Sequence, residues 1–100
     1  MEFLVYIELE APPDMAPALL DELRAREAVH ARMLTARGDL VRLWRVPGRW
    51  ANWGYWHASS ADALHEILRG LPLYPLMKTT VHPLDPHPND PGPARRQPAG

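Results

Sequence analysis

Apolar residues recur along four short stretches in the way that is typical of β-strands: residues 3–10, 40–46, 50–57 and 78–84. The first stretch alternates in part, with Phe3, Val5, Ile7 and Leu9 on one face and mixed side chains on the other. The third is aromatic on both faces, with Asn52 and Trp56 on one side and Trp53 on the other. Because large apolar patches are seldom left in water, each face of this sheet must be shielded, and we expect helices on one face and a second copy of the chain on the other.

Two further stretches carry apolar residues at helical spacing. Residues 15–37 predict a long helix whose apolar stripe comprises Leu19, Leu20, Leu23, Met33 and Leu34. Asp14 is expected to cap its start, and Gly38 can end it in a left-handed conformation. A shorter helix, capped by Ser59 or Ser60, is predicted through about Arg69, with Gly70 as its stop.

The predicted order β-α-β-β-α-β is that of an α+β, ferredoxin-like fold, an antiparallel sheet with both helices on one face. Dimers of such units commonly pair sheet to sheet. We expect one domain over residues 1–85. Six of the chain's twelve prolines occur from Pro83 onward among polar residues, so residues 86–100 are predicted to form a flexible, proline-rich tail.

Composition narrows the possible partners and compartments. The formal net charge is −1 and the basic residues are scattered, so neither nucleic acid nor an anionic membrane is expected as a partner. The chain has no cysteine, which excludes disulfides and thiolate chemistry and suits a reducing compartment. With an acidic rather than basic start and no long apolar run, the sequence predicts a soluble cytoplasmic protein.

Three polar residues interrupt the apolar stripe of the long helix at its middle turn: Arg26, Glu27 and His30. A helix built only for stability would carry leucine there. Because desolvating an unpaired carboxylate is costly, Glu27 is either paired in a structural salt bridge with an arginine or retained for chemistry.

The chain resembles the muconolactone isomerase family at short motifs spread over residues 1–85: Pro12 to Met15, Arg26-Glu27, Leu43 to Val46, Gly48, Ala51-Asn52, Leu64-His65, Gly70 to Leu73, Pro75 and Met77. It departs at Arg24, where the family usually has lysine, and at His30, where an aromatic hydroxyl is usual. The resemblance implies a subunit of the dimeric α/β-barrel class that assembles into larger rings, typically decamers. It also implies cofactor-free isomerisation of muconolactone to the 3-oxoadipate enol-lactone in catechol catabolism, and relatives of the family act on chlorinated muconolactones.

Such a double-bond shift needs a base, a donor to the carbonyl oxygen and a cation for the substrate carboxylate. Glu27 is the candidate base, with a pKa expected to rise on burial. His30 lies one turn further and could share the proton, although a core histidine fits equally well. His65, which matches the family, is a third catalytic candidate or else makes a helix-to-loop hydrogen bond.

Four residues are predicted to bind the substrate: Arg26, Trp44, Arg45 and Asn52. Arg45 suits the carboxylate because its planar guanidinium binds carboxylates in a bidentate way, the alternative being a surface ion pair. Trp44 lies next to Arg45 on one strand, so the two face opposite sides of the sheet, and Trp44 is either a pocket wall or part of the dimer face. Asn52 either donates to the lactone carbonyl or fixes the strand edge.

No metal site and no cofactor are expected, because the five histidines form no i,i+4 pair and no glycine-rich phosphate loop occurs. The partners predicted are a small lactone substrate and further copies of the chain. Two alternatives stay open: a cofactor-independent oxygenase of the same barrel class, and a non-catalytic subunit that binds a small ligand.

Overall fold

The chain folds in the predicted order of elements. The computed structural model describes residues 1–92, and residues 93–100 of the predicted tail lie outside the described part. The elements are β1 (Glu2–Leu9), α1 (Pro17–Ala36), β2 (Leu40–Arg45), β3 (Ala51–His57), α2 (Ala61–Arg69), the short 3-10 turn η1 (Tyr74–Leu76) and β4 (Met77–Leu84). Every predicted strand end lies within one residue of the observed end.

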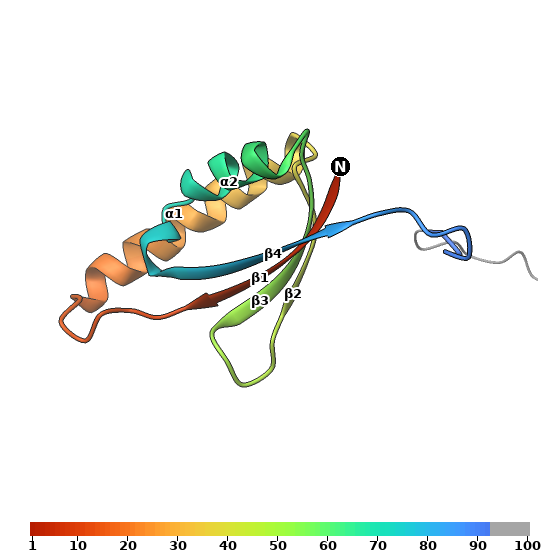
Figure 1. Cartoon of the computed structure of the whole chain (residues 1–100). Coiled ribbons are helices and arrows are strands. Elements are labelled where there is room, and N and C mark those ends of the chain that lie inside the picture. Colours follow the sequence, from red (N-terminus) through yellow and green to blue (C-terminus); the bar gives the residue numbers. More distant parts are fainter. Residues whose placement is uncertain (93–100) are drawn as a thin grey trace, which may run out of the picture.

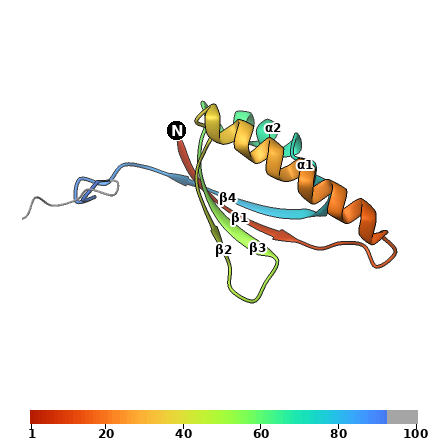
Figure 2. The ribbon, with the colours of Figure 1, turned by 180° about the vertical axis from the view of Figure 1, so that it is seen from behind.

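The four strands form one antiparallel sheet in the order β2-β3-β1-β4, and both helices lie on the same face of it (Figures 1 and 2). This arrangement confirms the α+β, ferredoxin-like prediction. Residues 85–92 are almost all exposed and lead away from the sheet (Figure 1). None of the helices in residues 1–92 has the length and apolar character needed to cross a membrane.

The core lies between the helices and the central strands. Phe3, Val5 and Ile7 of β1 are buried there, as the alternating pattern predicted, and they pack with Leu34 of α1 and Trp56 of β3. Leu64 and Leu68 give α2 its buried face. Gly54 of β3 is also buried, and it lies on the face of the strand that the helices cover.

The start of α1 differs from the prediction. The N-cap residue is Ala16 and no side chain caps the helix, so the expected cap by Asp14 is wrong. The cause is Pro17, whose ring disfavours helical geometry at the residue before it, so the helix can begin only at the proline. The other caps are as predicted: Gly38 has φ +83°, and the Ser60 hydroxyl accepts a hydrogen bond of 3.0 Å from the Ala63 amide.

The apolar stripe of α1 is only partly buried. Leu34 is in the core, but Leu19 is 45% exposed and Met33 is 41% exposed. Figure 1 shows the reason for the exposure of Leu19: the first turns of α1 extend past the ends of the strands. The spacing correctly predicted a helix, but not that the helix would be longer than the sheet it covers.

An irregularity in β2 decides which side chains face the helices. The register of β2 against β3 shifts between Leu40 and Arg42, as in a β-bulge. Beyond the shift Leu43 pairs with Gly54 and Arg45 with Asn52, on the helix-covered face, whereas Trp44 pairs with Trp53 on the other face. The prediction that Trp44 and Arg45 face opposite sides is therefore confirmed.

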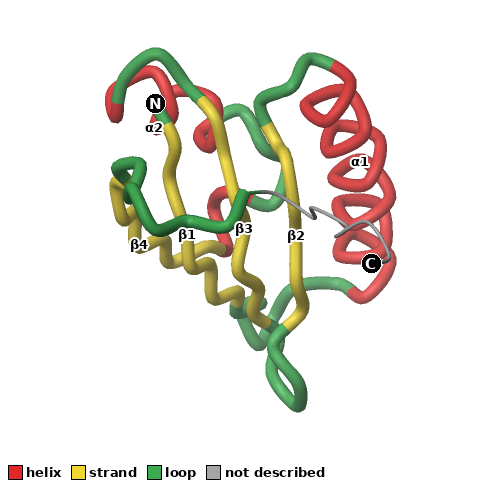
Figure 3. Tube along the Cα trace, turned by 90° about the vertical axis from the view of Figure 1, so that its right-hand side faces the viewer, coloured by secondary structure: helices red, strands yellow, loops and turns green. Residues whose placement is uncertain are grey.

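We call the sheet face turned away from the helices the outer face. The Tyr6 and Trp53 rings pack against each other there, tilted by 50° with their centroids 4.8 Å apart, and the Arg42 guanidinium lies 4.9 Å from the centre of the Trp44 ring. Trp44 is 44% exposed. Figure 3 shows the strands from a third direction, with β2 nearest to α1. In the described part of the chain no helix covers the outer face, so its aromatic groups remain partly open to solvent.

Candidate active site

A small cavity lies between α1 and the sheet, and Glu27 reaches into it from the middle of the helix. Its volume is about 40 Å³. Asn52 and Trp56 of β3 line it from the sheet, and the other lining residues are apolar: Ile7, Ala31, Leu34, Leu40, Leu43, Leu71 and Met77. Leu43, on the edge strand β2, is 51% exposed, which places one wall of the cavity next to solvent. We call this space the Glu27 cavity.

The Glu27 carboxylate is held by a backbone amide rather than by a cation. Its Oε1 accepts a hydrogen bond of 2.9 Å from the Leu73 amide, in the loop that follows α2. None of the ion pairs found in residues 1–92 includes Glu27, so the structural salt bridge that the sequence left open does not form. The fold fixes this carboxylate without neutralising it.

Burial raises the pKa of the Glu27 carboxyl above its ordinary value of 4.5. The Leu73 hydrogen bond and the nearby His30 act in the opposite direction and offset part of this effect on the pKa. A carboxylate with a raised pKa is a stronger base than an exposed one, and this one stands in a largely apolar cavity. These are the properties of a group that accepts a proton from carbon.

Two polar atoms on the sheet side of the cavity have no hydrogen-bond partner among residues 1–92: Asn52 Oδ1 and Trp56 Nε1. Both are buried, and Trp56 as a whole is only 2% exposed. Leaving a buried donor or acceptor unpaired costs about 1–3 kcal/mol, so such groups are uncommon in a core without a purpose. The residues around the Glu27 cavity therefore include one carboxylate and two buried polar groups whose hydrogen-bonding capacity is unused within residues 1–92.

An arginine-rich hollow lies on the same side of the sheet, at the turn between β2 and β3. It measures about 630 Å³ and is lined by Arg24, Arg45, Gly48, Arg49 and Trp50. The Arg24 guanidinium lies 4.6 Å from the centre of a Trp50 ring, and Arg49 pairs with Glu8 at 2.8 Å. Arg45 is in none of the ion pairs of residues 1–92, and its register partner is Asn52.

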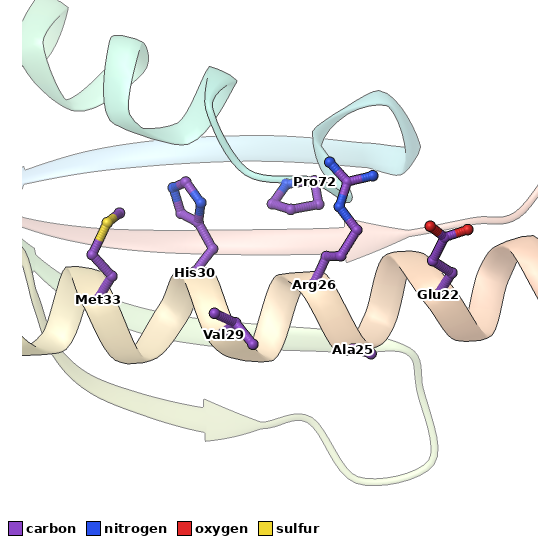
Figure 4. Close-up of a pocket in the computed structure, with 7 residues that line it drawn as sticks. All are labelled: Glu22, Ala25, Arg26, Val29, His30, Met33 and Pro72. Carbon is purple, nitrogen blue, oxygen red and sulfur yellow. The ribbon is translucent and has the colours of Figure 1, made fainter.

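Arg26 and His30 lie elsewhere, in a groove on the outside of α1. This groove of about 450 Å³ is lined by Glu22, Ala25, Arg26, Val29, His30, Met33 and Pro72. Figure 4 shows Arg26 and His30 directed toward the loop that carries Pro72. The polar trio seen in the sequence is thus divided, because Glu27 faces the sheet whereas Arg26 and His30 face the groove. The effect of His30 on the pKa of Glu27 is electrostatic.

The remaining two predicted site residues are placed away from Glu27. His65 is half-buried on α2 and lines neither the Glu27 cavity nor the outer groove of α1, so the geometry gives its predicted catalytic role no support. Trp44 lies on the outer face and does not line the Glu27 cavity, and whether it forms a pocket wall or part of the dimer face stays a prediction.

Two residues that the sequence did not single out for the site lie within it: Arg24 and Trp56. Arg24 is three positions before Glu27, the spacing that puts two side chains on one helix face. Trp56 shares the face of β3 with Asn52, four positions earlier. The spacing of each residue from a predicted site residue could therefore have identified it from the sequence. Among residues 1–92 no group of three or more His, Cys, Asp or Glu side chains gathers in a way that could hold a metal ion.

A four-stranded antiparallel sheet with two helices on one face, enclosing a desolvated carboxylate, defines a ferredoxin-like α+β subunit equipped for acid–base chemistry. Comparison with known proteins is more specific, because the family model of muconolactone delta-isomerase matches residues 1–90. The chain belongs to the muconolactone delta-isomerase family.

Individual relatives agree with this assignment. The chain is 42% identical over 89 residues to muconolactone delta-isomerase of Cupriavidus pinatubonensis, covering 89% of this chain and 97% of the relative. It is 36% identical over 88 residues to the Rhodococcus opacus protein of the same name, covering 88% and 95%. A crystal structure of muconolactone isomerase superposes with a TM-score of 0.84 at 36% identity, over 96% of this chain and all (100%) of that one.

A more distant structure shares only the fold. The 5-chloro-2-hydroxyhydroquinone dehydrochlorinase of Burkholderia phenoliruptrix, in complex with 2,5-dihydroxybenzoquinone, superposes with a TM-score of 0.64 at 18% identity, over 85% of this chain and 94% of that one. The ferredoxin-like subunit is thus also present in a protein of distant sequence.

Proposed function

We propose that this chain is a cofactor-free isomerase that converts muconolactone to the 3-oxoadipate enol-lactone, in the catabolism of catechol. The observation that carries the proposal is the Glu27 carboxylate, which forms no ion pair within residues 1–92 and is held by the Leu73 amide in a largely apolar cavity. Membership of the muconolactone delta-isomerase family supports the choice of substrate.

Glu27 is the base in this mechanism. It takes a proton from the carbon at the far end of the lactone's conjugated system, leaving a dienolate whose negative charge lies largely on the carbonyl oxygen. The same carboxyl then delivers the proton to the carbon next to the carbonyl, so the double bond moves and no atom is gained or lost. Because the pKa of Glu27 is raised, the carboxylate takes the proton more readily than an exposed glutamate would.

The substrate also carries a carboxylate, and the arginine-rich hollow is where we place it. Arg45 is the primary partner, since no ion pair in the described part of the chain engages it and a guanidinium binds carboxylates through two parallel hydrogen bonds. Its register partner Asn52 lines the Glu27 cavity, so a molecule bound to Arg45 has its lactone ring directed toward Glu27. Arg24 adds a second positive charge to the same hollow.

The test is ultraviolet-monitored conversion of muconolactone by the purified wild-type chain and by Glu27→Gln. Glutamine keeps the size of the side chain and an oxygen for the Leu73 amide but cannot accept the proton, so we expect kcat to fall by about 10²–10⁴-fold. Glu22→Gln is the matched control, because Glu22 is an exposed carboxylate on the same helix. A wild-type chain inactive on muconolactone would refute the proposal, and a fully active Glu27→Gln would refute the role of Glu27.

We further propose that a second copy of this chain covers the outer face, and that such dimers build a larger ring, as the family resemblance implies. The Tyr6–Trp53 ring pair and the exposed Trp44 support this, because aromatic patches are seldom left in water. The ring size and the cytoplasmic location stay predictions.

A further inference from the structure

The Trp56 side chain is packed against a glycine in a way that fixes the position of its N–H group. A Cβ atom added to Gly54 would lie 2.4 Å from Trp56 Nε1 and 3.1 Å from Cδ1 of the same ring. The indole therefore lies back along β3 over Gly54, and its nitrogen occupies space that any other residue at position 54 would fill. Since Gly54 stands between Trp56 and Asn52, the N–H group is on the Asn52 side of the ring.

That N–H group has no hydrogen-bond partner in the part of the chain that the structure describes. It is fully buried, and it belongs to a side chain that is 2% exposed and lines the Glu27 cavity. An indole nitrogen can only donate a hydrogen bond. The other unpartnered atom, Asn52 Oδ1, is an acceptor, which repels a negatively charged oxygen unless the amide turns over. Of the two free polar atoms, Trp56 Nε1 is thus the one suited to an oxyanion.

We propose that the Trp56 indole N–H donates a hydrogen bond to the lactone carbonyl oxygen and stabilises the negative charge that develops there. This inference rests on the proposed isomerase function and adds a second catalytic residue to it. Glu27 on α1 and Trp56 on β3 line the same cavity, which at about 40 Å³ has room for little more than one water molecule, so the lactone must displace side chains to enter it. Between the two residues it would present its carbon skeleton to the base and its carbonyl oxygen to the donor.

The division of roles is balanced for charge and protons. As the C–H bond breaks, the proton goes to Glu27 and the electron pair moves through the conjugated system onto the carbonyl oxygen. Trp56 keeps its own proton throughout and only shares it in the hydrogen bond. When Glu27 returns its proton to carbon, the oxygen becomes a carbonyl again and the hydrogen bond weakens. A donor that is strongest to the intermediate lowers the barrier without tightening substrate binding.

The experiment removes the N–H group while keeping the shape of the ring. Trp56 is replaced by 3-benzothienylalanine, in which sulfur takes the place of N–H, and in parallel by phenylalanine (Trp56→Phe). Steady-state kinetics on muconolactone are compared with those of the wild type and of Trp53→Phe, which removes an indole N–H from the opposite face of the same strand. We expect kcat to fall by about 10²-fold in both Trp56 variants, the lower limit for loss of one oxyanion donor, with KM changed only a few-fold.

Three outcomes decide the matter. A fall in kcat in the benzothienyl variant, with the Trp53→Phe control at the wild-type level, supports the proposal. If the benzothienyl variant has wild-type kcat, Trp56 is a packing residue and the inference is overturned while the isomerase function stands. If the wild-type chain itself does not convert muconolactone, the proposed function fails and this inference fails with it.

Discussion

Gly54 offers a direct test of the geometry at the centre of this site. In Gly54→Ala the new methyl carbon would lie 2.4 Å from Trp56 Nε1, whereas non-bonded carbon atoms prefer about 3.5–4.0 Å. The indole must therefore move by about 1 Å or more within a close-packed core. Overpacking of this kind costs about 1–3 kcal/mol, and alanine returns about 0.5–1 kcal/mol by restricting the unfolded chain. The difference spans about 0–2.5 kcal/mol, and because the contact is with a rigid ring we expect a net loss in its upper half, about 1–2.5 kcal/mol in the free energy of unfolding.

The matched control is Gly70→Ala. Gly70 ends α2 with φ −76°, a conformation that alanine adopts readily, and its added Cβ would approach no atom closer than 3.4 Å. Thermal unfolding of both variants at equal protein concentration should place Gly54→Ala lower by about 4–8 °C for each kcal/mol lost. It should also have lower isomerase activity, because the indole is displaced. A Gly54→Ala variant that unfolds at or above the temperature of Gly70→Ala would refute the placement of Trp56 over Gly54.

Two other predictions concern the charge of Glu27 and the outer face. Because burial raises the pKa of Glu27 above 4.5, its contribution to stability is fully present below that pH and is lost as the pH rises through the raised pKa. Denaturant titrations over this range should show a smaller loss of stability with pH in Glu27→Gln than in Glu22→Gln; equal slopes would contradict a desolvated Glu27. On the outer face, Trp53→Glu places a charge beside Tyr6 and should lower the molar mass measured by light scattering. The control Trp53→Phe keeps an apolar ring and should leave the molar mass unchanged. An unchanged mass in Trp53→Glu would contradict dimerisation through this face.

The fold could be predicted from the sequence because its main determinants are local. Alternation at Phe3, Val5 and Ile7 and the capping serine at position 60 each specify one element by themselves, and the order of the elements then leaves few topologies. The error at the start of α1 is also local, since Pro17 disfavours helical geometry at Ala16 and so excludes the earlier start suggested by Asp14.

The site was harder to predict because its contacts are long-range. The sequence marks Glu27 as a polar residue in an apolar stripe, but its partner is the Leu73 amide, which lies in the loop after α2 and which a side-chain pattern cannot reveal. Arg26 and His30 are near Glu27 in the sequence, yet the helix directs their side chains to another surface. The role proposed for Trp56 depends on how its ring lies over Gly54, which spacing along a strand does not determine.

The register shift in β2 lets this strand hold one residue more than β3 over the same length. Leu40, Leu43 and Arg45 all stand on the helix-covered side of the sheet, although regular alternation would put Leu40 and Leu43 on opposite faces. If β2 kept every residue but paired regularly from Leu40 onward, Trp44 would stand opposite Asn52 and Arg45 would turn to the outer face. Deleting Val41 would remove the extra residue and keep Arg45 opposite Asn52. The bulge, as much as the identity of the residues in β2, thus determines which charge meets a ligand.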